Sequence, residues 1–385
     1  MKPYKCSNIR NIALAGHGGS GKTSLAESLM YVSGGLDRMG KVADGSTVCD
    51  FDPDEIRRKI SLNAALAYAE WKDVKINILD TPGQFDFVGE MLEGIRAAES
   101  VIITLPAKDG VQVGTIKAYN EAKSLKKASM FVVTRMEEEN SNFYRCLEEL
   151  KTNFGPTICP IVVPFDKYGK VESYINLLEM KAYEYSEGGK RKEVEMPASE
   201  NRLKGLRAAM AEAIAETDED IMMRYFENEG EDFTFAEIVK GIHDGIDQGV
   251  ITPVVCCSGD TLASVDMLLE TIVYMLPSAS ERPGEPKKEE YIKYEEDKPL
   301  SAFVFKTVAD PFVGKMSFIK VVQGKLSVNS PIVNATTGEA EKPGKILTLK
   351  GKKQEELAEA CAGDIVVVTK LNANTNDTLC DPSNV

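Results

Sequence analysis

Residues 16–24 read GHGGSGKTS and comprise Gly16, His17, Gly18, Gly19, Ser20, Gly21, Lys22, Thr23 and Ser24. The run contains the pattern GxxxxGK[ST] and stands between an apolar stretch at 11–15 and an amphipathic one at 22–32. This order is typical of a buried strand, a glycine-rich turn and a helix. Backbone N–H groups of such a turn, together with the helix N-terminus, can cradle phosphates. The sequence therefore predicts a phosphate-binding loop, in which Lys22 reaches the β and γ phosphates and Thr23 binds Mg²⁺.

Short apolar runs continue to alternate with amphipathic stretches out to about residue 280, as in a parallel sheet with crossover helices. The expected strands cover 11–15, 74–79, 101–105, 129–133 and 254–257, and the expected helices cover 22–32, 88–99, 115–126, 142–153 and 265–275. Residues from about 156 to 252 interrupt the pattern, and they are too many for a structureless loop, since loops beyond about 15 residues are uncommon. We therefore expect an α/β domain over 1–280 that contains an inserted α+β subdomain.

The character of the chain changes after this domain. The segment 281–299 is rich in charge and proline, so we expect a linker there. Beyond it, short β-like runs such as AFVFKTV, SFIKVV and DIVVVT are separated by turn signals. Residues 300–385 are therefore predicted to form a small β-barrel.

The overall composition limits the classes of function. The chain has 385 residues, with 60 acidic against 46 basic side chains and a net charge of −14, which argues against a general DNA-binding role. Eight cysteines without a CxxC pair indicate a reducing compartment, and two histidines exclude a multi-histidine metal site. The opening residues lack a signal-peptide core, and no apolar run reaches membrane-spanning length. We expect a cytoplasmic monomer that binds neither DNA nor a membrane.

A second motif, DTPGQ at 80–84, directly follows the expected strand 74–79. Parallel strands present their ligands at their carboxyl ends, so Asp80 should face the same phosphates and hold Mg²⁺ through water. The N–H group of Gly83 can meet the γ phosphate. A loop that contacts the γ phosphate and then runs into a helix is typical of a nucleotide-dependent switch.

Longer stretches resemble a known family, the translational GTPases, and among them elongation factor G and its paralogues. They are GHGGSGKTSL, DTPGQFDFVGE, INLLEMKAYEY, AIAETDEDIMMRY, PVVCCS, LLETIVYMLPS, DPFVGKMSFIKVVQGKL and AGDIVVV. The resemblance implies a P-loop GTPase domain with an insert, followed by a β-barrel second domain. It also implies GTP or GDP and Mg²⁺ as ligands, and the ribosome, through its RNA and proteins, as the partner. The family's further three domains have no counterpart here, so we expect a fragment.

The resemblance places recognition of the base at Thr134, Arg135 and Glu137, where the family reads NKMD, and at Ser258 and Gly259, where it reads Ser-Ala. Glu137 keeps a carboxylate for guanine, one methylene further out, and Arg135 keeps a long cationic stem that can cover the base. Thr134 loses the amide of the family's asparagine. Because a site that hydrogen-bonds a base edge can discriminate by about 10⁴ or more, these changes leave guanine specificity open.

The two switches also depart from the family. The first, ERGIT in the family, reads RRKIS at 57–61, and Ser61 retains a hydroxyl for Mg²⁺ or is an ordinary turn serine. Gln84 stands where the family has the histidine that orients the attacking water. Glutamine does this in other P-loop GTPases, so Gln84 and Lys22 are the candidate catalytic residues, and a solvated Gln84 in a poor catalyst is the alternative.

More than one function is compatible with these residues. The first is a GTPase that the ribosome stimulates and that alone turns over at roughly 10⁻⁴ to 10⁻² per second. The second is a drifted nucleotide-responsive module that binds the ribosome and hydrolyses little or nothing. A fragment of a ribosome-protection or recycling paralogue is a third. The basic run KPGKILTLKGKK at 342–353 is either a solvated loop or a contact with ribosomal RNA.

Overall fold

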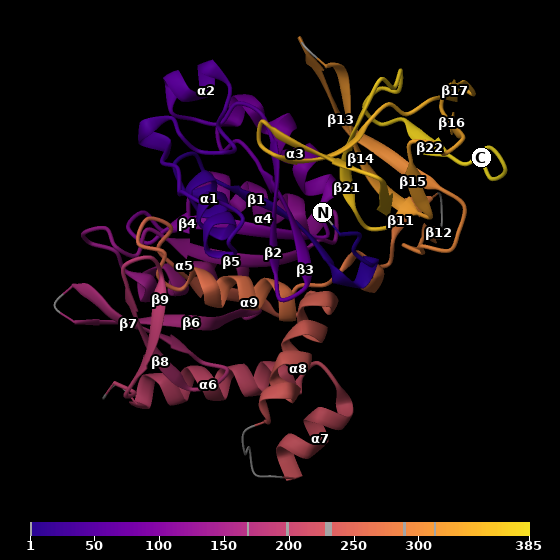
Figure 1. The fold of residues 1–385 in the computed structure, drawn as a ribbon. Helices are drawn as coiled ribbons and strands as arrows, with labels where there is room; N and C mark the ends of the chain where they lie inside the picture. Colours follow the sequence, from indigo (N-terminus) through magenta and orange to yellow (C-terminus); the bar gives the residue numbers. More distant parts are fainter. Residues whose placement is uncertain (1, 168, 198–199, 228–232, 288–289, 312) are drawn as a thin grey trace.

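The first domain is built on a mostly parallel sheet. The computed structural model describes residues 2–167, 169–197, 200–227, 233–287, 290–311 and 313–385. Within them, ten strands form one sheet in the order β2-β3-β1-β4-β5-β10-β6-β7-β8-β9 (Figure 1). The consecutive strands β3, β1, β4, β5, β10 and β6 of this order run parallel to one another. The strands are β1 Ile9–Gly16, β2 Ala65–Trp71, β3 Val74–Asp80, β4 Ser100–Pro106, β5 Ala128–Thr134, β6 Ile158–Lys167, β7 Lys170–Asn176, β8 Lys181–Ser186, β9 Lys190–Val194 and β10 Thr252–Cys256. The predicted α/β fold with a parallel-type sheet is confirmed.

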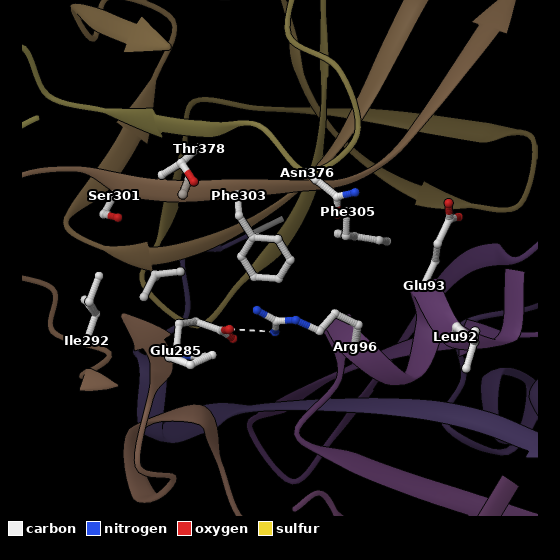
Figure 2. A pocket seen from close by; sticks show the side chains of 13 residues that line it. Leu92, Glu93, Arg96, Glu285, Ile292, Ser301, Phe303, Phe305, Asn376 and Thr378 are labelled. Carbon is white, nitrogen blue, oxygen red and sulfur yellow. Dashed lines mark ion pairs between the residues drawn. The ribbon is translucent and has the colours of Figure 1, made fainter. Parts of the chain in front are cut away.

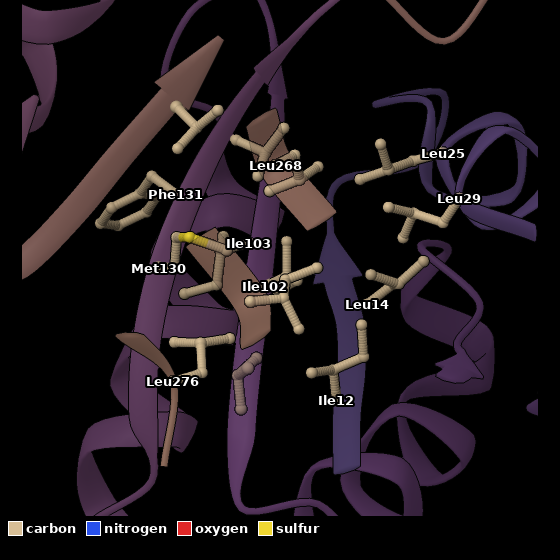
Figure 3. Close-up of a cluster of buried hydrophobic side chains, with 14 of the residues drawn as sticks. Ile12, Leu14, Leu25, Leu29, Ile102, Ile103, Met130, Phe131, Leu268 and Leu276 are labelled. Carbon is tan, nitrogen blue, oxygen red and sulfur yellow. The ribbon is translucent and has the colours of Figure 1, made fainter. Parts of the chain in front are cut away.

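Helices cover the central strands and bury their apolar side chains. Figure 3 shows Leu25 and Leu29 of α1, with Leu268 of α9, on the same side of the sheet as Ile12 and Leu14 of β1. Burying one such side chain stabilises the fold by about 1.5–3 kcal/mol. The packed side chains of β1 and α1 therefore hold in place the two elements that the phosphate loop connects. None of the described helices is long and apolar enough to cross a membrane. The helices around the central strands are α1 Lys22–Val32, α3 Val88–Ala97, α4 Val113–Ser124, α5 Phe143–Phe154 and α9 Val265–Met275, while the short helix α2 Pro53–Arg58 lies in the connection between α1 and β2.

The insert continues the sheet of the first domain. Its first strand, β6, lies parallel to β10, and β7, β8 and β9 follow it as an antiparallel meander. Where the insert is described, three helices complete it, with α8 packed against α9 (Figure 1). They are α6 Glu200–Ala215, α7 Glu219–Glu227 and α8 Phe235–Gln248. The predicted α+β subdomain is thus joined to the core by shared backbone hydrogen bonds.

The second domain is antiparallel β-structure, as predicted, and lies beside α3 in Figure 1. Within the described residues, its main sheet has the order β17-β16-β22-β13-β14-β21-β18-β19, and β15 pairs with β20 in a short separate ladder. The strands are β13 Ser301–Asp310, β14 Gly314–Gln323, β15 Lys325–Ser327, β16 Ile332–Asn334, β17 Ala340–Glu341, β18 Ile346–Lys350, β19 Lys353–Leu357, β20 Glu359–Cys361, β21 Ile365–Thr369 and β22 Thr378–Cys380.

The segment expected as a linker, 281–299, is packed between the two domains. It contains the short strands β11 (Glu285–Lys287) and β12 (Glu290–Ile292), which pair with each other. After them, the hydroxyl of the buried Tyr294 donates to Oε1 of Glu99 in the first domain, at 3.3 Å. The connection between the domains is therefore structured where the chain is described.

Candidate functional site

The glycine-rich loop joins β1 to α1 at the carboxyl edge of the parallel sheet. Gly16, with φ of 138°, lies so close to β4 that a Cβ there would be 2.5 Å from the carbonyl oxygen of Thr104. Gly21, with φ of 87°, precedes the first residue of α1 and has no side chain to cover the first N–H groups of the helix. A loop with this geometry leaves backbone donors facing the space in front of it, which suits a phosphate group.

Lys22 extends back over the loop from the start of α1. Its Nζ donates to the carbonyl oxygens of Gly16 at 3.2 Å and His17 at 2.9 Å. Burial lowers the pKa of Lys22, while the nearby carboxylates of Asp80 and Asp50 oppose that decrease. A buried ammonium held by carbonyl groups is placed to exchange them for the oxygens of an anionic ligand.

The DTPGQ loop closes on the phosphate loop. A Cβ on Gly83 would lie 2.4 Å from Lys22 Nζ and 2.7 Å from the backbone nitrogen of Gly18, so only glycine fits at this approach. A Cβ on Gly18 would lie 2.6 Å from Nε2 of Gln84. The structure therefore brings the backbone of Gly83 and the side chain of Gln84 against the phosphate loop.

Two hydroxyls and two carboxylates meet beside Lys22. The hydroxyl oxygens of Thr23 and Ser61 are 3.1 Å apart, which joins the first switch to the phosphate loop. Asp80 is 1% exposed, and neither of its carboxylate oxygens has a hydrogen-bond partner within the described residues. Burial raises the pKa of Asp80, and the negative charge of Asp50 raises it further.

These groups fit a hard divalent cation. Buried carboxylates without partners are costly, and Mg²⁺ prefers oxygen ligands, with some of its positions filled by water and phosphate. The hydroxyls of Thr23 and Ser61 and the carboxylate of Asp80 are the oxygen groups that would hold such an ion. Asp50 was not among the predicted residues. Its signal is weak, because a single aspartate between Cys49 and Phe51 follows no spacing that marks a site.

His17 has a packing role in this arrangement. Its ring makes an edge contact with Phe85, with the ring centroids 5.7 Å apart. The start of α4 presses on it, since a Cβ on Gly114 would lie 2.6 Å from the Cα of His17. The residue therefore connects the phosphate loop to the second switch and to α4.

The residues predicted to read the base lie at the next strand ends, after β5 and β10. Thr134 is buried, and its hydroxyl donates to the carbonyl oxygen of Ser20 at 2.8 Å. Gly259 lies over the start of α1, where a Cβ would be 3.4 Å from the carbonyl oxygen of Ser24. Thr134 thus ties the β5 end to the phosphate loop without offering an amide to a ligand.

The charged groups of Glu137 and Arg135 have different surroundings. Burial raises the pKa of Glu137, and hydrogen bonding to Ser258 opposes the increase. Arg135 has φ of 58°, is 41% exposed at its side chain, and pairs with Glu138 at 2.8 Å. The Glu137 carboxylate therefore faces the second base-reading loop, while the Arg135 cation already has a partner.

Comparisons with known proteins identify the family of the chain. Residues 7–278 match the family model described as the elongation factor Tu GTP binding domain, and residues 299–382 match elongation factor G domain 2. An elongation factor G-like protein of Thermotoga maritima is 36% identical over 369 residues, which are 94% of this chain and 52% of that protein. A crystal structure of a Thermus thermophilus protein has a TM-score of 0.87 at 33% identity, over 97% of this chain and 54% of that one.

The chain thus spans about half the length of these relatives. The two domain matches follow one another along the chain, and the first covers the residues predicted to form the phosphate loop, the switches and the base-reading loops. The chain belongs to the elongation factor G-like family of translational GTPases, of which it contains the GTP-binding domain and the second domain.

Proposed function

We propose that the protein binds Mg²⁺·GTP in this site and hydrolyses it slowly alone and faster on the ribosome, in the cytoplasm. The observation that carries the proposal is the meeting of Lys22, Thr23, Ser61 and Asp80 at the mouth of the glycine-rich loop. The name of the Thermotoga relative supports a role in translation. The chain covers only about half the length of this relative, so hydrolysis on the ribosome is proposed for it and does not follow from the likeness alone.

Each residue has a defined role in this proposal. Lys22 would exchange its carbonyl partners for β and γ phosphate oxygens, and the N–H of Gly83 would donate to the γ phosphate. Thr23 and Ser61 would hold Mg²⁺ with support from Asp80; when bound, the ion neutralises charge that develops on the phosphate oxygens.

Gln84 would orient the water that attacks the γ phosphate. Its amide already lies against Gly18, at the edge of the phosphate loop. A side-chain amide can accept a hydrogen bond from water and donate one to a phosphate oxygen, which is what positioning requires. Hydrolysis by the chain alone is therefore expected to be slow, because an activator is needed to fix this geometry.

Release of phosphate with and without ribosomes tests the proposal. We expect ribosomes to accelerate the wild type, Lys22→Ala to abolish turnover through loss of binding, and Gln84→Ala to bind GTP normally but lose the stimulated rate. Equal rates for all three proteins would reject the catalytic assignment.

A second candidate is a nucleotide-responsive ribosome ligand that hydrolyses little. The observation in its favour is the base end, where Arg135 is engaged with Glu138 and Thr134 with Ser20. Titration with GTP, ATP and XTP separates the two. Equal affinity for GTP and ATP would reject guanine recognition, and the site would then be a general nucleotide site.

A further inference from the structure

One carboxylate joins both switches to the second domain. Oε2 of Glu90, in the first turn of α3, accepts a hydrogen bond from the backbone N–H of Ala64 at 2.6 Å. The same oxygen pairs with the ammonium of Lys306 on β13. Ala64 follows shortly after Ser61 of the first switch, and α3 follows the DTPGQ loop. Three segments that are far apart in the sequence therefore meet at Glu90.

This contact is more than a surface ion pair. Lys306 is only 5% exposed, and it also lies near Glu93, whose pKa it holds down against the effect of burial. A buried ammonium is costly without a partner, whereas exposed pairs contribute little. The pairing of Lys306 with α3 is therefore expected to persist in solution.

The second domain also contacts the segments that flank the first switch. The N–H of Gly351, at the tip of the β18–β19 hairpin, donates to the carbonyl oxygen of Leu66 at 3.0 Å. A Cβ on Gly351 would lie 1.8 Å from the carbonyl oxygen of Val48, just before Asp50. Lys350 donates to the carbonyl oxygen of Gly35 at 3.0 Å, so this lysine of the basic run faces the first domain. The segments before and after the first switch, at Val48 and Leu66, thus lie against the second domain.

The far end of α3 is fixed independently of the switches. Figure 2 shows Arg96 paired with Glu285, at 2.6 Å, beneath the ring of Phe303. Further along the interface the buried Lys320 pairs with Glu99, and Lys75 pairs with Asp364 at 2.8 Å. These contacts hold the second domain against the first, so that Lys306 has a fixed position beside the start of α3.

We propose that Glu90 is a positioning residue through which the second domain favours the closed, triphosphate-binding arrangement of the first switch. This rests on the proposed function. The arrangement described is the closed one, since Ser61 lies 3.1 Å from Thr23, and in it Ala64 reaches Glu90. A ligand that binds only when the switch is closed has a higher affinity because of this contact. The affinity of a ligand that binds equally well to the open switch is unchanged. By linkage, the triphosphate should in turn strengthen the contact.

The test uses paired substitutions that remove both members of an ion pair. Glu90→Leu with Lys306→Met removes the acceptor and both charges at similar volume. The matched control, Glu285→Gln with Arg96→Met, removes an ion pair at the other end of the same helix. Affinities for GDP and for a non-hydrolysable GTP analogue are measured by calorimetry. We expect the Glu90–Lys306 double variant to lose about tenfold in analogue affinity and less than about twofold in GDP affinity, with an unchanged ratio in the control.

A second measurement does not depend on the variants folding. Hydrogen exchange of the Ala64 amide in the wild type should be slower with the GTP analogue than with GDP. Equal exchange, or equal affinity ratios in both double variants, would overturn the inference while leaving the proposed function intact. A wild type that binds neither nucleotide would overturn both.

Discussion

The two ends of the nucleotide site are built in different ways. At the phosphate end, Lys22, Thr23 and Asp80 are all buried, and backbone geometry sets the shape of the loop. At the base end, recognition depends on a few side chains, of which Arg135 is 41% exposed and paired with Glu138. Backbone-built sites resist sequence change because the fold itself maintains them. Side-chain-built sites can change while the fold remains.

Thr134 illustrates the difference. It replaces an asparagine of the family motif, yet its hydroxyl donates to the carbonyl oxygen of Ser20 and keeps the base loop tied to the phosphate loop. The structural part of this position is preserved and only the ligand-facing amide is lost. The predictions below break or sharpen this contrast, beginning with the largest expected effect.

Replacing Lys22 with methionine should break the phosphate end. Since a hydrogen bond to a charged group contributes about 1.5–3 kcal/mol and Lys22 would make more than one, GTP affinity should fall by about a hundredfold or more. Equilibrium binding of a fluorescent GTP analogue measures this. Lys41→Met, an exposed lysine of the same domain, is the control and should bind normally. Normal binding by the Lys22 variant would contradict the assignment of the phosphate loop.

Replacing Asp80 with asparagine should have opposite effects on stability and on binding. Without metal, asparagine removes a buried carboxylate that lacks hydrogen-bond partners and repels Asp50. This gain should exceed the lost attraction to Lys22, so the free energy of unfolding should rise by about 1–3 kcal/mol. With Mg²⁺ and GTP, the same change should weaken binding by about tenfold, because the metal loses its support. Chemical denaturation without metal and calorimetry with it measure the two effects. A variant that is less stable without metal would show that the carboxylate has a structural partner instead.

Restoring the family's residues at the base end should sharpen recognition. Thr134→Asn, Arg135→Lys and Glu137→Asp together should raise the preference for GTP over ATP by about tenfold or more, because the carboxylate returns to the reach of the guanine edge. Competition titrations measure the ratio. Phosphate-end affinity, measured with inorganic triphosphate, should stay unchanged, and a parallel change there would mean that the two ends are not separable.

Lowering the pH should weaken base recognition before it affects the fold. Burial raises the pKa of Glu137, so protonation removes its acceptors as the pH falls toward that raised pKa. Because the pKa of Glu137 is higher in the folded protein than in the unfolded chain, the folded state gains stability through this group as the pH falls. The preference for GTP over ATP should therefore fall a few-fold as the pH is lowered from neutral, while the fold stays intact. In Glu137→Gln the preference should be low and independent of pH.

Much of the fold could be predicted because its strongest signals are local. The helix expected at 22–32 is α1 with the same bounds, and the strands at 74–79 and 101–105 lie within β3 and β4. The antiparallel strand β2 was missed, since ALAYAEW is rich in alanine and has no β-branched residue. The pairing of β6 with β10 was also missed, because it joins segments that the insert separates in the sequence.

The site divides in the same way. The motif fixes Lys22 and Thr23 by spacing, and the DTPGQ loop fixes Asp80 and Gly83. Asp50 and Glu90 reach the site or its switches only through the folded chain. Their roles depend on distances between segments, and spacing along the chain carries no information about these distances.

The hydrogen bond from Gly351 to Leu66 covers part of an outer edge of the main sheet. β2 is an outer strand of the main sheet, and such strands offer unpaired backbone groups to other chains. The hairpin tip occupies one of these groups and shields its surroundings. The GTP-binding domain produced without the second domain should therefore aggregate more readily than the two-domain chain, even where its core is intact.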